Sequence, residues 1–350
     1  FLGVAVYYVL AVLRPQYMWA WSLPPGVPWS LIVALATIAA AVFSAGTRKG
    51  PAGRITPAHG LVLAFGAWIG LTTALAHNRD AAYPWFVEYA KIFLMFAVSM
   101  LLIRTVRQVW VLFCLMALSL GYIAYEINAL YLTQGFLGIQ RDGYGGFDNN
   151  VAGLMLAMGV PMCYFAWEGG RSRFRWVFLI LIPPLLHAVL MTYSRGAMVS
   201  LIAVTPLVGV RSRYRGAFAL VALGLLALLP FLAGPEIRER FFSIQSHQQD
   251  ESAQLRRASW AAGWNIALDH PIFGVGVRNA NLFSHMYGAD AEGRTIHSQY
   301  LQIAADNGFV GLGLYLGVLA TAWSSLRRVR REAARDPGPG GRQGLALVSG

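Results

Sequence analysis

The sequence contains little charge, few cysteines and almost no lysine. Charged residues make up 13% of its 350 residues, whereas a soluble domain averages about 25%. Its two cysteines, Cys114 and Cys163, both lie inside apolar segments, so we expect neither a disulfide nor a thiolate metal site. The shortage of charge argues against an ordinary soluble domain.

Long apolar runs fill most of the chain instead. The runs 29–45, 60–76 and 216–233 are about 17 to 20 residues long and carry little or no charge. An α-helix of that length spans a hydrocarbon core of roughly 30 Å, because each residue adds about 1.5 Å. Backbone groups in lipid must form hydrogen bonds within their own segment, which favours helices. The sequence therefore predicts an all-α fold, a polytopic transmembrane helical bundle.

About ten candidate spans can be drawn along the chain. They are 1–13, 29–46, 60–76, 84–103, 109–133, 149–168, 174–192, 196–210, 216–233 and 308–326. Both ends of the chain lie in apolar runs, so we expect a fragment of a protein with 12 or so spans.

The basic residues, 26 arginines and two lysines, indicate the orientation of the spans. They exceed the 16 acidic residues and give a net charge of +12, which in a soluble protein would suggest a nucleic-acid partner. Assigning the loops alternately to two sides places 17 basic residues on one side and 10 on the other, six of them in one long loop. Short loops rich in Arg and Lys stay cytoplasmic. We therefore expect a lipid-bilayer partner, no nucleic acid, and a long loop that faces the periplasm.

This orientation divides the chain into four predicted parts. The parts are a transmembrane bundle at 1–233, a periplasmic loop at 234–307 with short interfacial helices at about 253–270 and 296–306, a span at 308–326, and a cytoplasmic basic segment with the start of a further span at 327–350.

Two arginines on the predicted outer side are candidates for binding an anion. Arg195 lies in the tight connection 192–196 between two spans; either it snorkels to the interface or it faces a polar cavity. Arg256 lies near the start of the helix at 253–270, four residues before Trp260, and surface anchoring is its alternative role. Arginine suits phosphate because its planar fork donates two parallel hydrogen bonds.

A histidine follows in the same loop. We expect His297 in the first turn of the helix at 296–306, which ends at Asn307-Gly308 because that pair is a good C-cap. The partial positive charge of a helix start favours a neutral imidazole and stabilises a nearby anion. His297 could then act as a general base, and a capping or interface role is the alternative. The loop histidines show no metal-ligand spacing, so we expect no metal and no cofactor.

Two further polar residues are candidates for contact with a substrate. Lys91 lies about 10 Å below the outer surface, counted at about 1.5 Å per residue; it either pairs with Glu88 three residues earlier or lines a site. Asp148 or Asn149 should cap the helix that begins there, and a sugar contact by Asn149 is the alternative. His187, beside Pro183-Pro184, is expected to be a hydrogen-bonded core histidine.

Several motifs occur in a characteristic order. They are Gly-Phe-Asp-Asn-Asn at 146–150, Thr-Tyr-Ser-Arg-Gly at 192–196, Arg256 with Asp-His-Pro-Ile-Phe-Gly-Val-Gly at 269–276, His-Ser-Gln-Tyr-Leu-Gln at 297–302 and Gly-Phe-Val-Gly-Leu at 308–312. Over about residues 145 to 326, the sequence resembles the O-antigen ligase and polymerase superfamily of bacterial membrane glycosyltransferases. The first motif is similar to that of the O-glycosylation ligase branch associated with exosortase systems.

The resemblance implies a metal-independent, inverting glycosyltransferase of the bacterial inner membrane, with its active site facing the periplasm. The donor would be a glycan on undecaprenyl diphosphate, and the acceptor a hydroxyl on lipid A core, a glycan or a protein. Arg195 and Arg256 would hold the diphosphate, with Arg257 as an alternative to Arg256. His297 would activate the acceptor or bind phosphate.

Tyr193 and Asn149 are further substrate-binding candidates, together with Lys91 and Arg257. A polymerase that joins lipid-linked repeat units is the alternative within this class. A transporter or flippase of lipid-linked sugars is the alternative outside it. A path could be lined by Lys91, Glu88, Glu126 and His187.

Overall fold

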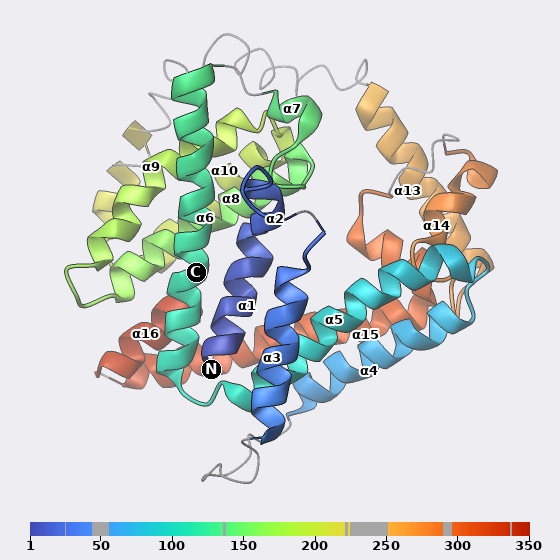
Figure 1. Cartoon of the computed structure of the whole chain (residues 1–350), viewed down its shortest axis with the longest axis horizontal. Coiled ribbons are helices and arrows are strands. Elements are labelled where there is room, and N and C mark those ends of the chain that lie inside the picture. The colour runs from blue at the N-terminus through green and yellow to red at the C-terminus, as the bar shows by residue number, and fades with distance from the viewer. Residues whose placement is uncertain are drawn as a thin grey trace. The chain divides into compact units, whose positions relative to one another are not determined.

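The computed structural model is helical throughout the residues it describes (Figure 1). These are residues 1–24, 26–43, 56–135, 138–220, 223–224, 251–289, 296–336 and 338–350, without the side chains of 251–253 and 339. Within them the only pairing of the β type is one bridge between Tyr144 and Phe147. The all-α prediction is therefore confirmed for this part of the chain. The chain forms two compact units: the first comprises Phe1–Lys49, Leu102–Gln245 and Arg328–Gly350, the second Gly50–Leu101 and Ser246–Arg327.

The first unit is a bundle built around three helices, α6 (Val106–Gln134), α8 (Asn149–Gly169) and α9 (Arg175–Met191), which contact one another. Small residues let these helices approach closely, as in other membrane bundles. A Cβ added at Gly121 would lie 2.5 Å from Leu181, and one at Gly159 would lie 2.9 Å from Leu185. Among its described residues, the unit also contains α1 (Leu2–Leu13), α2 (Pro15–Met18), α3 (Trp29–Phe43), α7 (Ile139–Asp142), α10 (Arg195–Arg211) and α16 (Pro339–Leu347).

The second unit combines two apolar helices with the predicted loop. The helices described in it are α4 (Pro57–Ala74), α5 (Arg79–Leu102), α13 (Glu251–Asp269), α14 (Asn279–Phe283), the 3-10 helix η3 (Ser284–Tyr287) and most of α15 (Gln299–Arg335). Its core includes Ile266, Val275 and Ile296, all nearly inaccessible to solvent. The loop residues described here thus have a core of their own.

Within the part of the chain that the structure describes, five helices are long and apolar enough to cross a membrane, judged by length and composition. They are α4, α5, α6, α8 and α15. The apolar helices α3 and α9 are shorter, and α1, with 12 residues, is about 18 Å long at 1.5 Å per residue. Each predicted span before residue 211 contains a helix, whereas the predicted span 216–233 lies largely outside the described residues. The count of about ten spans therefore stays a prediction, as does the loop at 234–250, which also lies outside them.

Two polar groups inside the first unit have partners within the bundle. His187 Nδ1 lies 2.6 Å from Asn128 Oδ1, so the prediction of a hydrogen-bonded core histidine is confirmed. The Tyr122 hydroxyl donates to the Glu126 carboxylate, which gives Glu126 a partner that the sequence did not reveal. Cys114 and Cys163 are both free thiols, as expected.

Candidate functional site

Arg195 is the first residue of α10, directly after a sharp turn. Helix α9 ends at Met191, and Ser194 caps α10 by accepting a hydrogen bond from the backbone N–H of Ala197 (3.3 Å). Tyr193, in this turn, is buried and has a φ of 53°, a left-handed conformation that is strained for a bulky residue. The turn leaves Arg195 half-buried at the end of the helix.

Residues at the start of α8 form hydrogen bonds that hold the connection between α9 and α10 in place. Asp148 caps α8 by accepting hydrogen bonds from the N–H groups of Asn150 (2.8 Å) and Val151, which confirms the capping prediction. Asn149 Nδ2 donates to the Thr192 carbonyl (3.2 Å). The Ser194 hydroxyl donates to Asn150 Oδ1 (2.8 Å). Two adjacent asparagines therefore bind the turn that carries Arg195.

Gly153, one turn further along α8, allows this close approach. A Cβ at Gly153 would lie 2.7 Å from Thr192 Oγ1 and 2.8 Å from the Ala197 Cβ. Both distances are shorter than side-chain atoms tolerate, so any larger residue would push α8 away from the turn.

On α13 the burial pattern separates Arg256 from Arg257. The buried residues form one stripe: Ser259, Ala262, Gly263, Ile266 and Ala267. At about 100° per residue, Arg256 lies roughly 50° from the centre of this stripe and Arg257 roughly 150° from it. Both arginines are exposed. Arg256 thus continues the packed face of the helix, whereas Arg257 belongs to the opposite, exposed face.

The packed face of α13 contacts the segment that precedes His297. A Cβ at Gly263 would lie 2.8 Å from the Ile296 side chain, and Ile296 is fully buried. His297, the next residue, is exposed and has a φ of 54°. Arg256 and His297 therefore extend from two segments of the second unit that pack together.

The position predicted for His297 within the helix was wrong. Helix α15 begins at Gln299, not at 296. The Ser298 carbonyl accepts the first helical hydrogen bond, from the N–H of Gln302 (2.8 Å), which makes Ser298 the N-cap, a position that serine favours. His297 consequently lies just before the helix. At the other end, Gly308 has a φ of 70° and interrupts α15, where the sequence predicts the end of the short helix.

A backbone strap, residues 271–276, runs along the end of this short helical segment. Its Val275 N–H donates to the Ala305 carbonyl (3.0 Å), and its Gly276 N–H to the Asp306 carbonyl (2.8 Å). Gly274 is required because a Cβ there would lie 2.4 Å from the Asp306 carbonyl carbon. The glycines of the 269–276 motif therefore allow two backbone segments to approach closely.

Asp306 is a buried residue beside the candidate site that the sequence analysis missed. Its buried carboxylate accepts hydrogen bonds from the N–H groups of Arg278 (2.9 Å) and Ala280 (3.0 Å) and from Gln302 Nε2 (2.8 Å). Next to it, Asn307 Oδ1 accepts a hydrogen bond from the Thr72 hydroxyl (2.7 Å). These bonds join parts of the chain that are far apart in sequence, so no local pattern could predict them.

His270 lies at the end of α13 beside a second histidine. Its ring contacts the edge of His77, with 4.9 Å between ring centroids. Burial lowers the pKa of His270 below its usual value, and nearby His77 adds to this effect, while Asp269 opposes it. The Tyr287 hydroxyl donates to Asp269 Oδ2 (2.8 Å), and this hydrogen bond raises the Tyr287 pKa.

Lys91 pairs with Glu88, as the three-residue spacing predicts. Lys91 Nζ lies 2.6 Å from Glu88 Oε1, and both side chains are partly exposed. The pair lies on α5, in the second unit.

The candidate site residues thus fall into two groups. The first unit contains Arg195, Tyr193 and Asn149, which the α8 contacts bring to one turn; the second contains Lys91, Arg256, Arg257 and His297.

Comparison with protein families gives two matches. Residues 1–137 match a family of unknown function (DUF5935), and residues 184–316 match the family described as O-Antigen ligase. No curated protein and no solved structure matches the chain. The second match contains Arg195, Arg256 and His297, and the apolar helices agree with a multi-pass membrane protein. Residues 184–316 thus form an O-antigen ligase domain, which supports membership of the O-antigen ligase superfamily.

Proposed function

We propose that this protein transfers a glycan from undecaprenyl diphosphate to an acceptor hydroxyl on the periplasmic face of the inner membrane. One observation carries the proposal: the O-antigen ligase match at 184–316 includes both arginines and the histidine expected to do the chemistry. The acceptor class is a hydroxyl of lipid A core, a glycan or a protein.

The proposed reaction is a displacement at the anomeric carbon of the donor sugar. The acceptor oxygen attacks from the face opposite the diphosphate and forms the new glycosidic bond, which inverts the configuration. The bond from the anomeric carbon to the diphosphate oxygen breaks, and undecaprenyl diphosphate leaves with the electron pair. The His297 imidazole takes the acceptor proton. The diphosphate already activates the sugar, so no cofactor is needed.

The arginines would stabilise the charge that develops on the departing diphosphate. Guanidinium donors fixed before the reaction lower a barrier most, because they need no reorganisation. Arg195 fits this role because a strained and hydrogen-bonded turn fixes its backbone. Arg256 fits it better than Arg257, because Arg256 lies on the face of α13 that packs toward Ile296 and His297.

The backbone at His297 supports a functional role for this residue. A non-glycine residue with positive φ is uncommon and costs of order 1–3 kcal/mol. Such strain concentrates at functional sites. Here it occurs at an exposed histidine between a buried isoleucine and a helix cap.

The test compares four alanine variants in membranes supplied with purified lipid-linked donor. Transfer should fall on the order of 100-fold or more for Arg195→Ala, Arg256→Ala and His297→Ala, in line with the loss of a single charge-stabilising donor. Arg257→Ala is the matched control and should stay within a few-fold of wild type. Wild-type transfer by all three test variants would refute the proposed mechanism.

Intact-mass analysis of the products identifies the acceptor class. A single addition to lipid A core or protein indicates a ligase, and a ladder of repeat units indicates a polymerase. Movement of the donor across vesicle membranes without a new glycosidic bond would indicate a transporter.

A further inference from the structure

We propose that Arg14 and the hairpin 144–147 together position Arg195. Arg14 lies within residues 1–137, which match a family of unknown function. This inference rests on the proposed function, since it assigns a role through Arg195. All the residues involved belong to the first unit.

Arg14 clamps the hairpin from the junction of α1 and α2. Its guanidinium carbon lies 4.2 Å from the ring centroid of Tyr17 and 4.1 Å from that of Phe147. Its Nη1 donates to the Gly146 carbonyl (2.8 Å). The backbone of Arg14 is left-handed, with a φ of 46°, where one helix ends and the next begins. Two ring contacts and one hydrogen bond therefore fix a single guanidinium.

The backbone of the hairpin allows this contact with Arg14. Tyr144 and Phe147 exchange two backbone hydrogen bonds (2.9 and 3.1 Å). Gly145 and Gly146 between them have φ values of 61° and 74°, the sign that a type I′ turn requires at both central positions. A Cβ at Gly146 would lie 2.7 Å from the Tyr17 ring, so glycine also makes room for the clamp.

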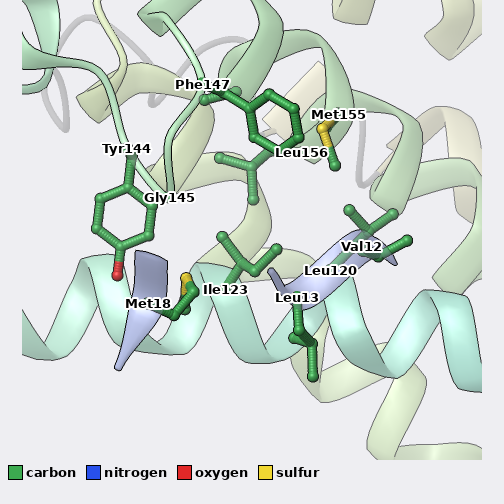
Figure 2. Close-up of a pocket in the computed structure, with 11 residues that line it drawn as sticks. Val12, Leu13, Met18, Leu120, Ile123, Tyr144, Gly145, Phe147, Met155 and Leu156 are labelled. Atoms are coloured by element: carbon green, nitrogen blue, oxygen red, sulfur yellow. The ribbon is translucent and has the colours of Figure 1, made fainter. Parts of the chain in front are cut away.

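A small pocket of about 10 Å³ adjoins the hairpin. Figure 2 shows Tyr144 and Phe147 at this pocket, together with Met18 and with Ile123 of α6. This space holds at most about one water molecule, so side-chain packing and the Arg14 contacts together position the hairpin.

The hairpin is connected to the turn that carries Arg195 through the first residues of α8. Phe147 precedes Asp148, the cap of α8, and the next two residues bind the turn: Asn149 through the Thr192 carbonyl and Asn150 through the Ser194 hydroxyl. Arg195 follows Ser194. A displaced hairpin should therefore shift the start of α8 and, with it, the guanidinium that meets the diphosphate.

The experiment measures kcat and KM for the lipid-linked donor in the full chain reconstituted into nanodiscs. Arg14→Ala and Tyr17→Ala should lower kcat about 10-fold or more with little change in KM, because misplacing a group that acts in the transition state affects kcat most. Tyr17→Phe keeps the ring and should restore wild-type kcat. Arg141→Ala is the matched control, because Arg141 is an exposed arginine of the neighbouring α7 that pairs with Asp142, and it should keep wild-type kcat.

A double variant separates this inference from the proposed function. If Arg14 acts through Arg195, Arg14→Ala should cause no further loss in an Arg195→Ala background. If the wild-type protein transfers no glycan from the donor, the proposed function fails. If Arg195→Ala alone leaves transfer intact, the role of Arg195 fails, and the positioning role of Arg14 fails with it. If Arg195→Ala abolishes transfer but Arg14→Ala and Tyr17→Ala both keep wild-type kcat, only the positioning role is overturned.

A third variant tests the same path in case Arg14→Ala and Tyr17→Ala fold poorly. Asn150→Leu removes the acceptor of the Ser194 hydroxyl without touching the clamp. A fall in kcat with unchanged KM supports the path to Arg195, and wild-type kcat in a folded Asn150→Leu protein overturns it.

Discussion

At the scale of single residues, close contacts decide which side chains the chain can accept. Gly153 is the clearest case, because the turn of Arg195 packs directly against it. The two asparagines that precede it on α8 bind that turn through hydrogen bonds. The position of Arg195 therefore depends on residues that need not touch a substrate.

Gly153→Ala should destabilise the protein by about 1–3 kcal/mol, because the new methyl group overpacks the contact. Gly196→Ala is the matched control: a Cβ there would meet only Ser194 Oγ, at 3.9 Å, so this variant should lose no stability. Unfolding by SDS in mixed micelles measures both. Equal stability of Gly153→Ala and wild type would contradict the packing argument.

His270 should make the second unit sensitive to acid. Its pKa is lowered in the folded protein, so the unfolded chain binds this proton first and the folded state loses stability as pH falls below the usual value of 6.5. Thermal unfolding at about pH 8 and about pH 5.5 measures the loss. His270→Phe should show a smaller loss on acidification, and replacement of the exposed His285 by Phe should leave the loss unchanged. An identical decline in wild type and His270→Phe would exclude this role.

At the scale of elements, long-range hydrogen bonds assemble the second unit. The strap 271–276 lies along the segment 299–307, and the Asp306 carboxylate joins this segment to the residues before α14. The packing of the loop segments against one another thus depends on a few buried polar groups.

Asp306→Ala should destabilise the second unit by about 3 kcal/mol or more, because it leaves two buried N–H groups without an acceptor at about 1–3 kcal/mol each. Limited proteolysis should then cleave within the loop segments faster than in wild type. Asp269→Ala is the control, since it removes a single contact with the partly exposed Tyr287, and should cost less than about 1 kcal/mol. Equal cleavage of the two variants would argue against a special role for Asp306.

The sequence predicted the local features of the fold and missed the distant ones. Apolar runs located the helices because burial in lipid requires continuous hydrophobicity. The helix before Gly308 began later than predicted because Ser298 caps it. The proposed preference for Arg256 over Arg257 rests on the buried face of α13, and the contacts of Asp306 join residues more than 20 positions apart.

At the scale of the whole molecule, the distribution of arginines predicts how the chain crosses the membrane. Single cysteines introduced into a variant without Cys114 and Cys163 test this with a membrane-impermeant maleimide on intact cells. Met286→Cys, at a residue that is 69% exposed, should react from the periplasm, whereas Ser172→Cys, in the loop with three arginines, should react only after lysis. The reverse pattern would invert the topology and with it the placement of the site.

The interruption of α15 at Gly308 has a mechanical consequence. The Phe309 N–H donates to the Pro271 carbonyl (2.7 Å), so the strap holds the joint while the apolar part of the helix continues beyond it. A jointed helix can tilt to match a thicker or thinner bilayer without rotating the residues that precede the joint. The geometry around His297 should therefore stay the same when the lipid composition changes.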